Sequence, residues 1–253
     1  MSSRTVVGAH PMCIETMRKL FILVLILLAG VTAHAQGMQT HLQPSAPPQD
    51  TPPTIVFTLS FPGATPPFFN IAIEDTGLAE YKSTPDLKNQ GDPYEVKFTA
   101  SDLARTRLFE LARQLNFFQG NYDYSKSKVA FTGTKTLTFK NGTDEHTTNY
   151  NWSQSPQIQE ITLTFQNISN TIEMGRQLAD KYRYDKLGVD AILSTMEQEA
   201  KENHLAELQI LQPILSRMAK DPGLMNISRR RAEFLLSKMP PGTSTADSAP
   251  GHP

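Results

Sequence analysis

The chain has 253 residues, with 24 lysines and arginines against 25 aspartates and glutamates, 39% hydrophobic residues and one cysteine. This length allows one sizeable domain, or one domain with a smaller appendage. The near balance of charge argues against a dedicated nucleic-acid-binding protein. A single cysteine excludes an intrachain disulfide framework and a cysteine-rich zinc module. The composition therefore predicts a soluble globular protein with disordered ends.

The N-terminal segment has the pattern of an export signal. Met17-Arg18-Lys19 forms a short basic start, about twelve apolar residues follow over 20–31, and Ala33-His34-Ala35 has the small-x-small pattern of a cleavage site. The apolar run is short for a membrane span, which needs roughly 20 residues. We therefore predict a signal peptide over 1–35, cleavage after Ala35, and no stable membrane span after cleavage. Met17 is the better start, which would place Cys13 outside the native chain.

Proline-rich segments flank the predicted core. Residues 36–53 hold five prolines, and 240–253 hold four. Such segments bury too little apolar surface to offset the entropy lost on ordering, so we interpret them as a linker and a disordered tail. Without 1–35 the chain keeps 21 basic and 24 acidic side chains, a balance that gives no overall attraction to nucleic acid or anionic lipid.

The first half of the core alternates apolar and polar residues, which is typical of half-buried strands. The alternating runs cover 54–61, 68–74, 78–83 and 94–99. Short turns join them, so antiparallel pairing is favoured. After a helix predicted from the N-cap Ser101 to Asn116, further strands are expected over 129–131, 135–140 and 145–152. Asn141-Gly142 predicts a hairpin between the last two.

From Ser155 the apolar period changes to three and four residues, which predicts one long helix over 155–184. Its stripe contains Ile158, Ile161, Phe165, Ile168, Ile172, Gly175, Ala179 and Tyr182. The β-branched run 161–165 alone would allow a strand, but the spacing on both sides favours a helix. We expect this helix to pack on the sheet and to carry the helices that follow.

Three more helical segments are predicted over 187–200, 205–219 and 224–239, with Pro213 kinking or interrupting the second. The fold class is therefore α+β: an antiparallel sheet with one inserted helix, then a long helix and a helical C-terminal part. The predicted domains are an α+β domain over 54–184 and a helical part over 185–239.

Few residues suggest a catalytic or metal site. Outside 1–35, two of the four histidines fall in the proline-rich ends. His204 lies near Glu197, Glu202 and Glu207 in the sequence, but these charges fit an exposed helix face better than a metal site. His146 is expected to be an exposed strand residue. No HExxH, GxSxG, SxxK, GxGxxG or P-loop motif occurs, so we predict no catalytic, metal-binding or cofactor-binding residue and no cofactor.

Two other groups of residues suggest surfaces. Arg229-Arg230-Arg231 is the densest charge cluster, but consecutive helical residues point in different directions, so we interpret it as an ordinary solvated face. An aromatic set on the predicted strands suggests a surface for carbohydrate or peptide, although such residues usually belong to the core. This set contains Tyr122, Tyr124, Phe131, Phe139, Tyr150 and Trp152.

The signal segment ending in AHAQ, the proline-rich linker and the run FQNISNTIEMGRQLADKYRYDKLGVDAIL together resemble uncharacterised exported proteins of soil bacteria, of the acidobacterial type. The resemblance covers most of 54–239. It implies an exported, periplasmic or extracellular location, and it carries neither an activity nor a catalytic residue.

The leading hypothesis is an exported, non-enzymatic protein that binds a protein or envelope partner or supports the cell envelope, and that does not bind nucleic acid. The alternatives are a secreted hydrolase with an unrecognised carboxylate or serine site, and a glycan or small-ligand binder that uses the hairpin aromatics. A cleft with perturbed carboxylates would favour the hydrolase.

Overall fold

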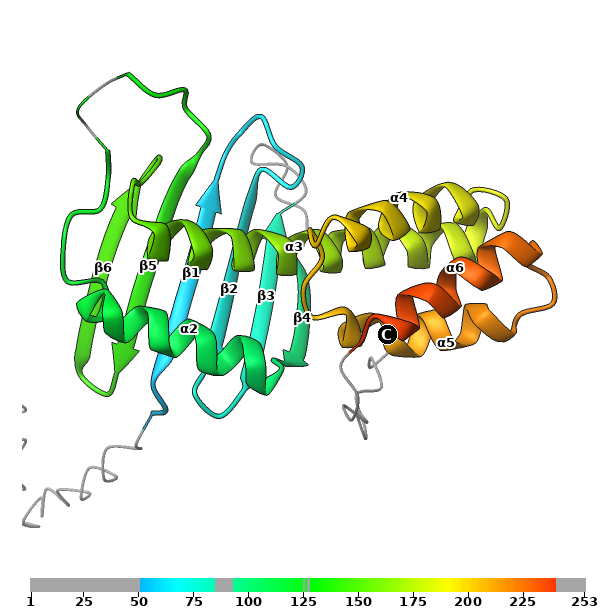
Figure 1. Cartoon of the computed structure of the whole chain (residues 1–253), viewed down its shortest axis with the longest axis horizontal. Coiled ribbons are helices and arrows are strands. Elements are labelled where there is room, and N and C mark those ends of the chain that lie inside the picture. Colours follow the sequence, from blue (N-terminus) through cyan, green and yellow to red (C-terminus); the bar gives the residue numbers. More distant parts are fainter. Residues whose placement is uncertain (1–50, 85–92, 125, 127, 240–253) are drawn as a thin grey trace, which may run out of the picture. The chain divides into compact units, whose positions relative to one another are not determined.

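A computed structural model describes residues 51–84, 93–124, 126 and 128–239 of the chain (Figure 1). The predicted signal peptide 1–35 with its cleavage site after Ala35, nearly all of the linker 36–53 and the tail 240–253 lie outside these residues. Within the described residues, no helix combines the length and the apolar character that a membrane span requires.

Six strands form one antiparallel sheet in the order β4-β3-β2-β1-β5-β6. Their bounds are β1 Thr54–Ser60, β2 Phe68–Glu74, β3 Leu78–Thr84, β4 Tyr94–Thr99, β5 Thr134–Asn141 and β6 Asp144–Tyr150. Strands that follow one another in the sequence pair from β1 to β4 and again from β5 to β6, and β5 pairs with β1. The predicted α+β class and antiparallel sheet are confirmed.

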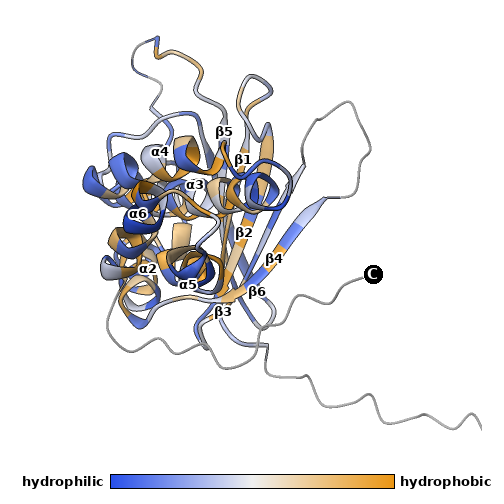
Figure 2. Cartoon of the chain, turned by 90° about the vertical axis from the view of Figure 1, so that its right-hand side faces the viewer, coloured by the Kyte–Doolittle hydropathy of each residue, from blue (hydrophilic) through white to orange (hydrophobic). Residues whose placement is uncertain are grey.

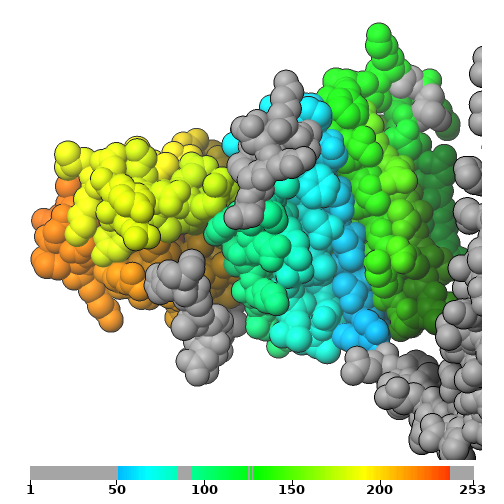
Figure 3. Space-filling view, turned by 180° about the vertical axis from the view of Figure 1, so that it is seen from behind, coloured from blue at the N-terminus to red at the C-terminus, as the bar shows by residue number. Residues whose placement is uncertain are grey.

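The two faces of the sheet differ because the apolar residues alternate. Phe57, Ile71 and Leu137 are fully buried on the inner face. The other face, seen from behind in Figure 3, is formed by the strands themselves. There Asn70 donates to the Thr58 hydroxyl at 2.9 Å, which joins β2 to β1 across the sheet.

Two helices cover the inner face: α2 (Asp102–Gln114) and α3 (Pro156–Tyr184). Each begins at a serine cap, since Ser101 Oγ accepts from the Ala104 N–H and Ser155 Oγ accepts from the Ile158 N–H. Figure 2 shows the helices on one side of the sheet. Both predicted caps are confirmed.

The long helix α3 confirms the helical period and excludes the strand alternative for 161–165. Ile161 and Phe165 are fully buried, whereas Leu163, which a strand would place beside them, is 53% exposed. One member of the predicted stripe is wrong. Ala179 is exposed and Leu178 is buried instead, because a period of 3.6 residues shifts the buried face along a long helix.

The last third of α3 extends into a second core, formed with three more helices and a short 3₁₀ segment. These are α4 (Val189–Lys201), η2 (Leu208–Leu211), α5 (Gln212–Lys220) and α6 (Asn226–Ser237). The predicted helix 205–219 is wrong as a single element, since 205–207 is not helical and η2 precedes α5. Pro213 lies in the first turn of α5, where its missing N–H costs no hydrogen bond and its ring starts the helix rather than kinking it.

The segment between α2 and β5 corrects another prediction. Residues 129–131 form no strand. Side-chain bonds hold this segment instead, since the Thr132 N–H donates to Asn151 Oδ1 and Asn151 Nδ2 donates to the Ala130 carbonyl. The predicted hairpin is confirmed, with Gly142 at φ +59° in its two-residue loop between β5 and β6.

Asp221, in the turn between α5 and α6, gives a pH-dependent prediction. Its carboxylate accepts from Lys186, from the Gly223 N–H and from Tyr182, and these contacts lower its pKa from 3.8 to about 2. Because the pKa is depressed in the folded state, the stabilisation is complete above the unfolded pKa of 3.8 and is lost as pH falls through about 2.

An NMR titration of the Asp221 carboxyl should therefore give a midpoint near 2. We expect Lys186→Gln to raise this midpoint, because the contact with Lys186 makes the largest contribution to the lowered pKa of Asp221. A wild-type midpoint at the ordinary value of 3.8 would show that the contacts of Asp221 are not formed in solution.

Candidate functional site

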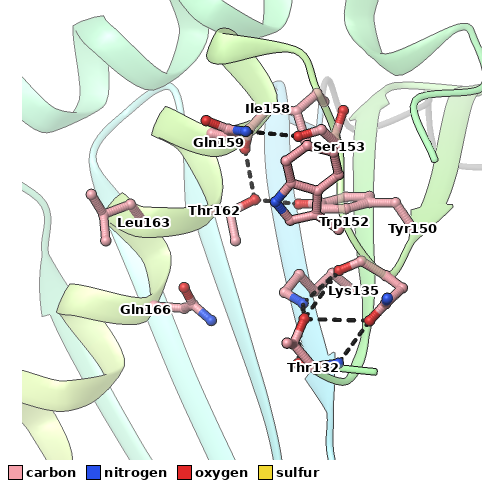
Figure 4. A pocket seen from close by; sticks show the side chains of 11 residues that line it. Thr132, Lys135, Tyr150, Trp152, Ser153, Ile158, Gln159, Thr162, Leu163 and Gln166 are labelled. Carbon is pink, nitrogen blue, oxygen red and sulfur yellow. Dashed lines mark hydrogen bonds between the residues drawn. The ribbon is translucent and has the colours of Figure 1, made fainter. Parts of the chain in front are cut away.

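A cavity of about 380 Å³ opens where the ends of β5 and β6 meet the first turns of α3 (Figure 4). Its volume falls within the range of small-molecule sites, about 300–1,000 Å³. Strand residues and the residues after β6 form one wall, and one face of α3 forms the other. The lining residues are Thr132, Lys135, Tyr150, Asn151, Trp152, Ser153, Ile158, Gln159, Thr162, Leu163 and Gln166. We call this cavity the Trp152 pocket.

Lys135 is a buried cation in the floor of the pocket, with 5% of its surface exposed. Its ammonium donates to the carbonyls of Asn151 (2.8 Å), Thr132 (3.1 Å) and Gly133 (3.2 Å), and to the Thr132 hydroxyl (3.0 Å). Burial lowers the pKa of this amine. Four acceptors occupy all three ammonium protons, so Lys135 fixes the loop before β5 and has no proton to offer a ligand.

Trp152 forms the rim of the pocket and is 37% exposed. Its ring and that of Tyr124 form a T-shaped pair, with a centroid distance of 5.1 Å and an interplanar angle of 83°. Its carbonyl accepts from the Tyr124 N–H at 2.8 Å. These contacts hold the indole in place. Among the described residues, the indole N–H has no hydrogen-bond partner, so it remains available to a ligand.

The α3 wall adds uncharged polar groups. Gln159 Nε2 donates to the Ser153 carbonyl at 2.8 Å, which leaves the amide oxygen of Gln159 as a free acceptor. The Gln166 amide, about two turns further along the helix, has no bond to any residue in the described part of the chain. A ligand in the pocket would therefore find the amide oxygen of Gln159 as an acceptor, both the oxygen and the NH₂ group of the Gln166 amide, and the indole N–H of Trp152 as a donor.

The interior of the pocket is closed by Tyr150 and Thr162. The two hydroxyls lie 2.6 Å apart, and Thr162 also donates to the Ile158 carbonyl. Burial raises the pKa of the Tyr150 phenol well above its ordinary value. This tyrosine therefore stays neutral over the whole working pH range, and the pair acts as a fixed hydrogen-bonded wall.

The residues that sequence reasoning considered for metal or acid–base chemistry do not meet in the pocket. His146 bonds Gln119 at 2.8 Å, and His204 bonds Glu199 at 3.2 Å and lies 3.5 Å from Glu202. Neither histidine has a serine hydroxyl as a partner in the described part of the chain. Within that part, no group of three histidines, cysteines or carboxylates is close enough to hold a metal ion.

The other two glutamates proposed around His204 have different roles. Glu197 pairs with Lys201 at 2.6 Å and with Arg231 at 3.2 Å. Glu207 is buried and accepts from both the N–H and the hydroxyl of Ser101, at 2.6 Å each. The prediction of an exposed helix face is therefore wrong for Glu207, because α4 ends at Lys201 and the chain after it carries Glu207, buried, to the start of α2.

The aromatic set divides between core and surface. Phe139 and Tyr150 are buried, and Tyr122 donates to the Leu115 carbonyl. Phe131 packs edge-on against Phe61. Only Trp152 lines the pocket with an exposed ring. Sequence reasoning missed Lys135, Gln159 and Gln166. The available signal for the glutamines was that each directly follows a residue of the apolar stripe, Gln159 after Ile158 and Gln166 after Phe165.

A second cavity, of about 480 Å³, lies between the start of α2 and the segment before η2. Leu103, Leu108 and Leu205 are among its apolar lining residues. Its buried carboxylate, Glu207, is already bonded to Ser101 and to Gln209. Arg107 and Lys238 also line this cavity; Arg107 is paired with Glu160, and the Lys238 ammonium lies 5.3 Å from the centre of the Phe234 ring. The second cavity therefore combines an apolar wall with two cations, whereas the Trp152 pocket offers a ligand uncharged polar groups.

Comparison with known proteins adds no further constraint, since the sequence matches no protein-family model and no curated protein.

Proposed function

We propose that this chain is an exported, non-enzymatic binding protein, and that the Trp152 pocket takes an uncharged, largely apolar group of a protein partner. The observation that carries this proposal is the exposed indole of Trp152, which is held rigidly at the mouth of a cavity while its N–H is left without a partner in the described chain. Tryptophan is enriched at the centres of protein interfaces because it combines a large apolar surface with one polar handle.

The chemistry of the lining supports an uncharged ligand. The only charged lining residue, Lys135, is saturated by protein acceptors. An ion that entered the pocket would lose its hydration without gaining a partner, which is unfavourable. Trp152, Leu163 and Ile158 supply an apolar surface, and Gln159 and Gln166 can bond a peptide N–H and C=O. A leucine or phenylalanine side chain with its own backbone amides fits this pattern.

Fluorescence provides the test, because Trp152 is the single tryptophan of the chain. The probes are N-acetyl-leucinamide and N-acetyl-phenylalaninamide, which present an apolar side chain between two neutral amides. We expect a saturable change in the emission of Trp152. Gln166→Ala should weaken binding by about fivefold, since one net hydrogen bond is worth about 1 kcal/mol. Gln177→Ala, an exposed position on the same helix, is the matched control.

Other outcomes would overturn the proposal. Saturation by methyl glucoside with no response to either amide would favour the glycan-binding alternative. Hydrolysis of p-nitrophenyl acetate that Gln166→Ala abolishes would favour the hydrolase alternative. An unchanged emission with all three probes would remove the pocket as a binding site.

Export is a separate prediction. Mass spectrometry of the protein recovered from the periplasmic or extracellular fraction should find Gln36 at its N-terminus, because Ala33-His34-Ala35 fits signal peptidase. Replacement of Ala35 by a bulky residue should block this cleavage. An exported protein that retains the segment 17–35 would contradict the prediction.

A further inference from the structure

The distal end of the helical part brings two turns together (Figure 1). Residues 185–188 link α3 to α4, and residues 221–225 link α5 to α6. Lys186 Nζ contacts Asp221 Oδ2 at 2.8 Å, and Tyr182 donates to the same oxygen at 2.8 Å. Residues 181–190 and 217–231 thus form one surface, which we call the distal tip.

The distal tip exposes large apolar side chains. Leu187 is 81% exposed, Tyr184 75%, Met225 44% and Ile227 39%. The Arg183 guanidinium lies 5.2 Å from the centre of the Tyr184 ring. Single exposed apolar residues are ordinary, but several on adjacent turns mark an interaction surface.

The distal tip is also strongly basic. It contains eight lysines and arginines against three aspartates. Each aspartate is already paired: Asp185 with Lys181, Asp190 with Arg231 and Asp221 with Lys186. The remaining cations have no carboxylate within ion-pair distance in the described part of the chain. They are Arg183, Arg217, Lys220, Arg229 and Arg230.

From this combination we infer that the distal tip docks on the surface of an anionic phospholipid bilayer. Unpaired cations attract anionic headgroups, and the apolar side chains enter the interface between headgroups and acyl chains. A soluble polyanion would satisfy the arginines but would leave Tyr184, Leu187, Met225 and Ile227 in water. A lipid surface satisfies both.

The distribution of charge over the chain agrees with this orientation. The whole chain has a net charge of −1, so the part outside the basic tip carries an acidic excess. An anionic membrane would attract the tip and repel the remainder, which would hold the sheet and the Trp152 pocket away from the lipid. The inference does not depend on what that pocket binds.

Vesicle sedimentation tests the apolar contribution. With the exported protein, we expect binding to phosphatidylglycerol vesicles at low salt, at least about tenfold weaker binding to phosphatidylcholine vesicles, and loss of most binding in 1 M salt, where the screening length is about 3 Å. Tyr184→Ser/Leu187→Ser should reduce binding by about tenfold or more. Leu103→Ser is the control, because Leu103 is as exposed as Leu187, at 81%, but lies on α2.

A second pair of variants tests the electrostatic contribution. Arg183→Gln/Arg230→Gln removes two unpaired tip charges and should weaken binding by at least about tenfold. Lys97→Gln/Arg113→Gln removes the same charge from exposed positions on β4 and α2 and should leave binding unchanged. Circular dichroism confirms that each variant is folded.

Three results would overturn the inference. The first is equal binding to both kinds of vesicle, and the second is equal loss in the tip and control variants. The third is that the protein binds polyphosphate but not vesicles, and that only the arginine variants weaken the binding to polyphosphate. That result would assign the tip to a soluble polyanion.

Discussion

Phe165→Ala should destabilise the protein by about 3–5 kcal/mol, the cost of deleting a large aromatic side chain from a packed core. Phe165 is fully buried in the middle of α3. Its ring stacks on that of Phe57 on β1, with a centroid distance of 5.1 Å and an interplanar angle of 4°. The substitution would open a cavity between the helix and the central strand, where neither neighbour can move in. Denaturant melts give the loss of unfolding free energy.

Leu163→Ala is the matched control for this loss. Leu163 belongs to the same turn of α3 but is 53% exposed, so its truncation should cost about 0.5 kcal/mol or less. If 161–165 were a strand, Ile161, Leu163 and Phe165 would share one face and Leu163→Ala would be as costly as Phe165→Ala. Equal losses at both positions would contradict the long helix.

Glu173→Ala should be the second most damaging change, at about 2–4 kcal/mol. Glu173 is 5% exposed on α3 and faces β3. Its Oε1 accepts from Ser83 at 2.6 Å and from Tyr81 at 2.8 Å, and its Oε2 pairs with Arg176 at 2.7 Å. Removal of the carboxylate takes away the acceptor of the buried Ser83 hydroxyl and leaves the Tyr81 hydroxyl only its longer contact with Ser169, at 3.2 Å. Burial also raises the pKa of Tyr81, so this phenol stays a neutral donor.

Two further variants separate the contributions at this site. Glu173→Gln keeps an acceptor for Tyr81 and Ser83 but loses the charge, so it should cost less than Glu173→Ala. Glu110→Ala, which removes an exposed partner of Arg107, should cost about 0.5 kcal/mol or less. A loss at Glu173→Ala no greater than that at Glu110→Ala would show that the buried network contributes nothing to the attachment of α3 to β3.

Local pattern predicted most of the elements. β2 and β4 have the bounds expected from alternation, and Ser155 and Pro156 begin α3 as expected, because each signal depends only on neighbouring residues. The failures involve distant partners. The run 129–131 has strand composition, but Asn151 holds the neighbouring backbone. Leu178 is buried in place of Ala179 because the last third of α3 packs in the second core, formed with the C-terminal helices.

The candidate site was only partly predictable for the same reason. Trp152 was in the aromatic set, but the exposure of its ring depends on the path that the chain takes from the end of β6 to the start of α3. Lys135 alternates with its neighbours like any strand residue, and nothing local indicates that carbonyls from positions 132, 133 and 151 surround its ammonium. Glu207 likewise reaches Ser101 from 106 positions away in the sequence.

The basic surface at the distal tip could not be predicted from the net charge of the chain. A chain near neutrality gives no reason to expect attraction to anionic lipid, and Arg229-Arg230-Arg231 on its own looks like a solvated helix face. The structure separates these three residues as expected, since Arg231 turns inward to Asp190. Arg183 in the last turn of α3 and Lys186 in the link to α4 lie beside the α5–α6 turn, and this proximity, which is a tertiary property, makes the end of the helical part basic.

Chemical-shift mapping with N-acetyl-leucinamide tests the central claim most directly. In ¹⁵N-labelled protein, the indole N–H of Trp152 and the side-chain amides of Gln159 and Gln166 should shift together and saturate at one probe concentration. Side-chain amides distant from the pocket, such as that of Gln177, should not move. Shifts that are confined to residues of the second cavity, such as Leu103 and Ala206, or the absence of any saturable shift at Trp152, would contradict the assignment of the Trp152 pocket as the binding site.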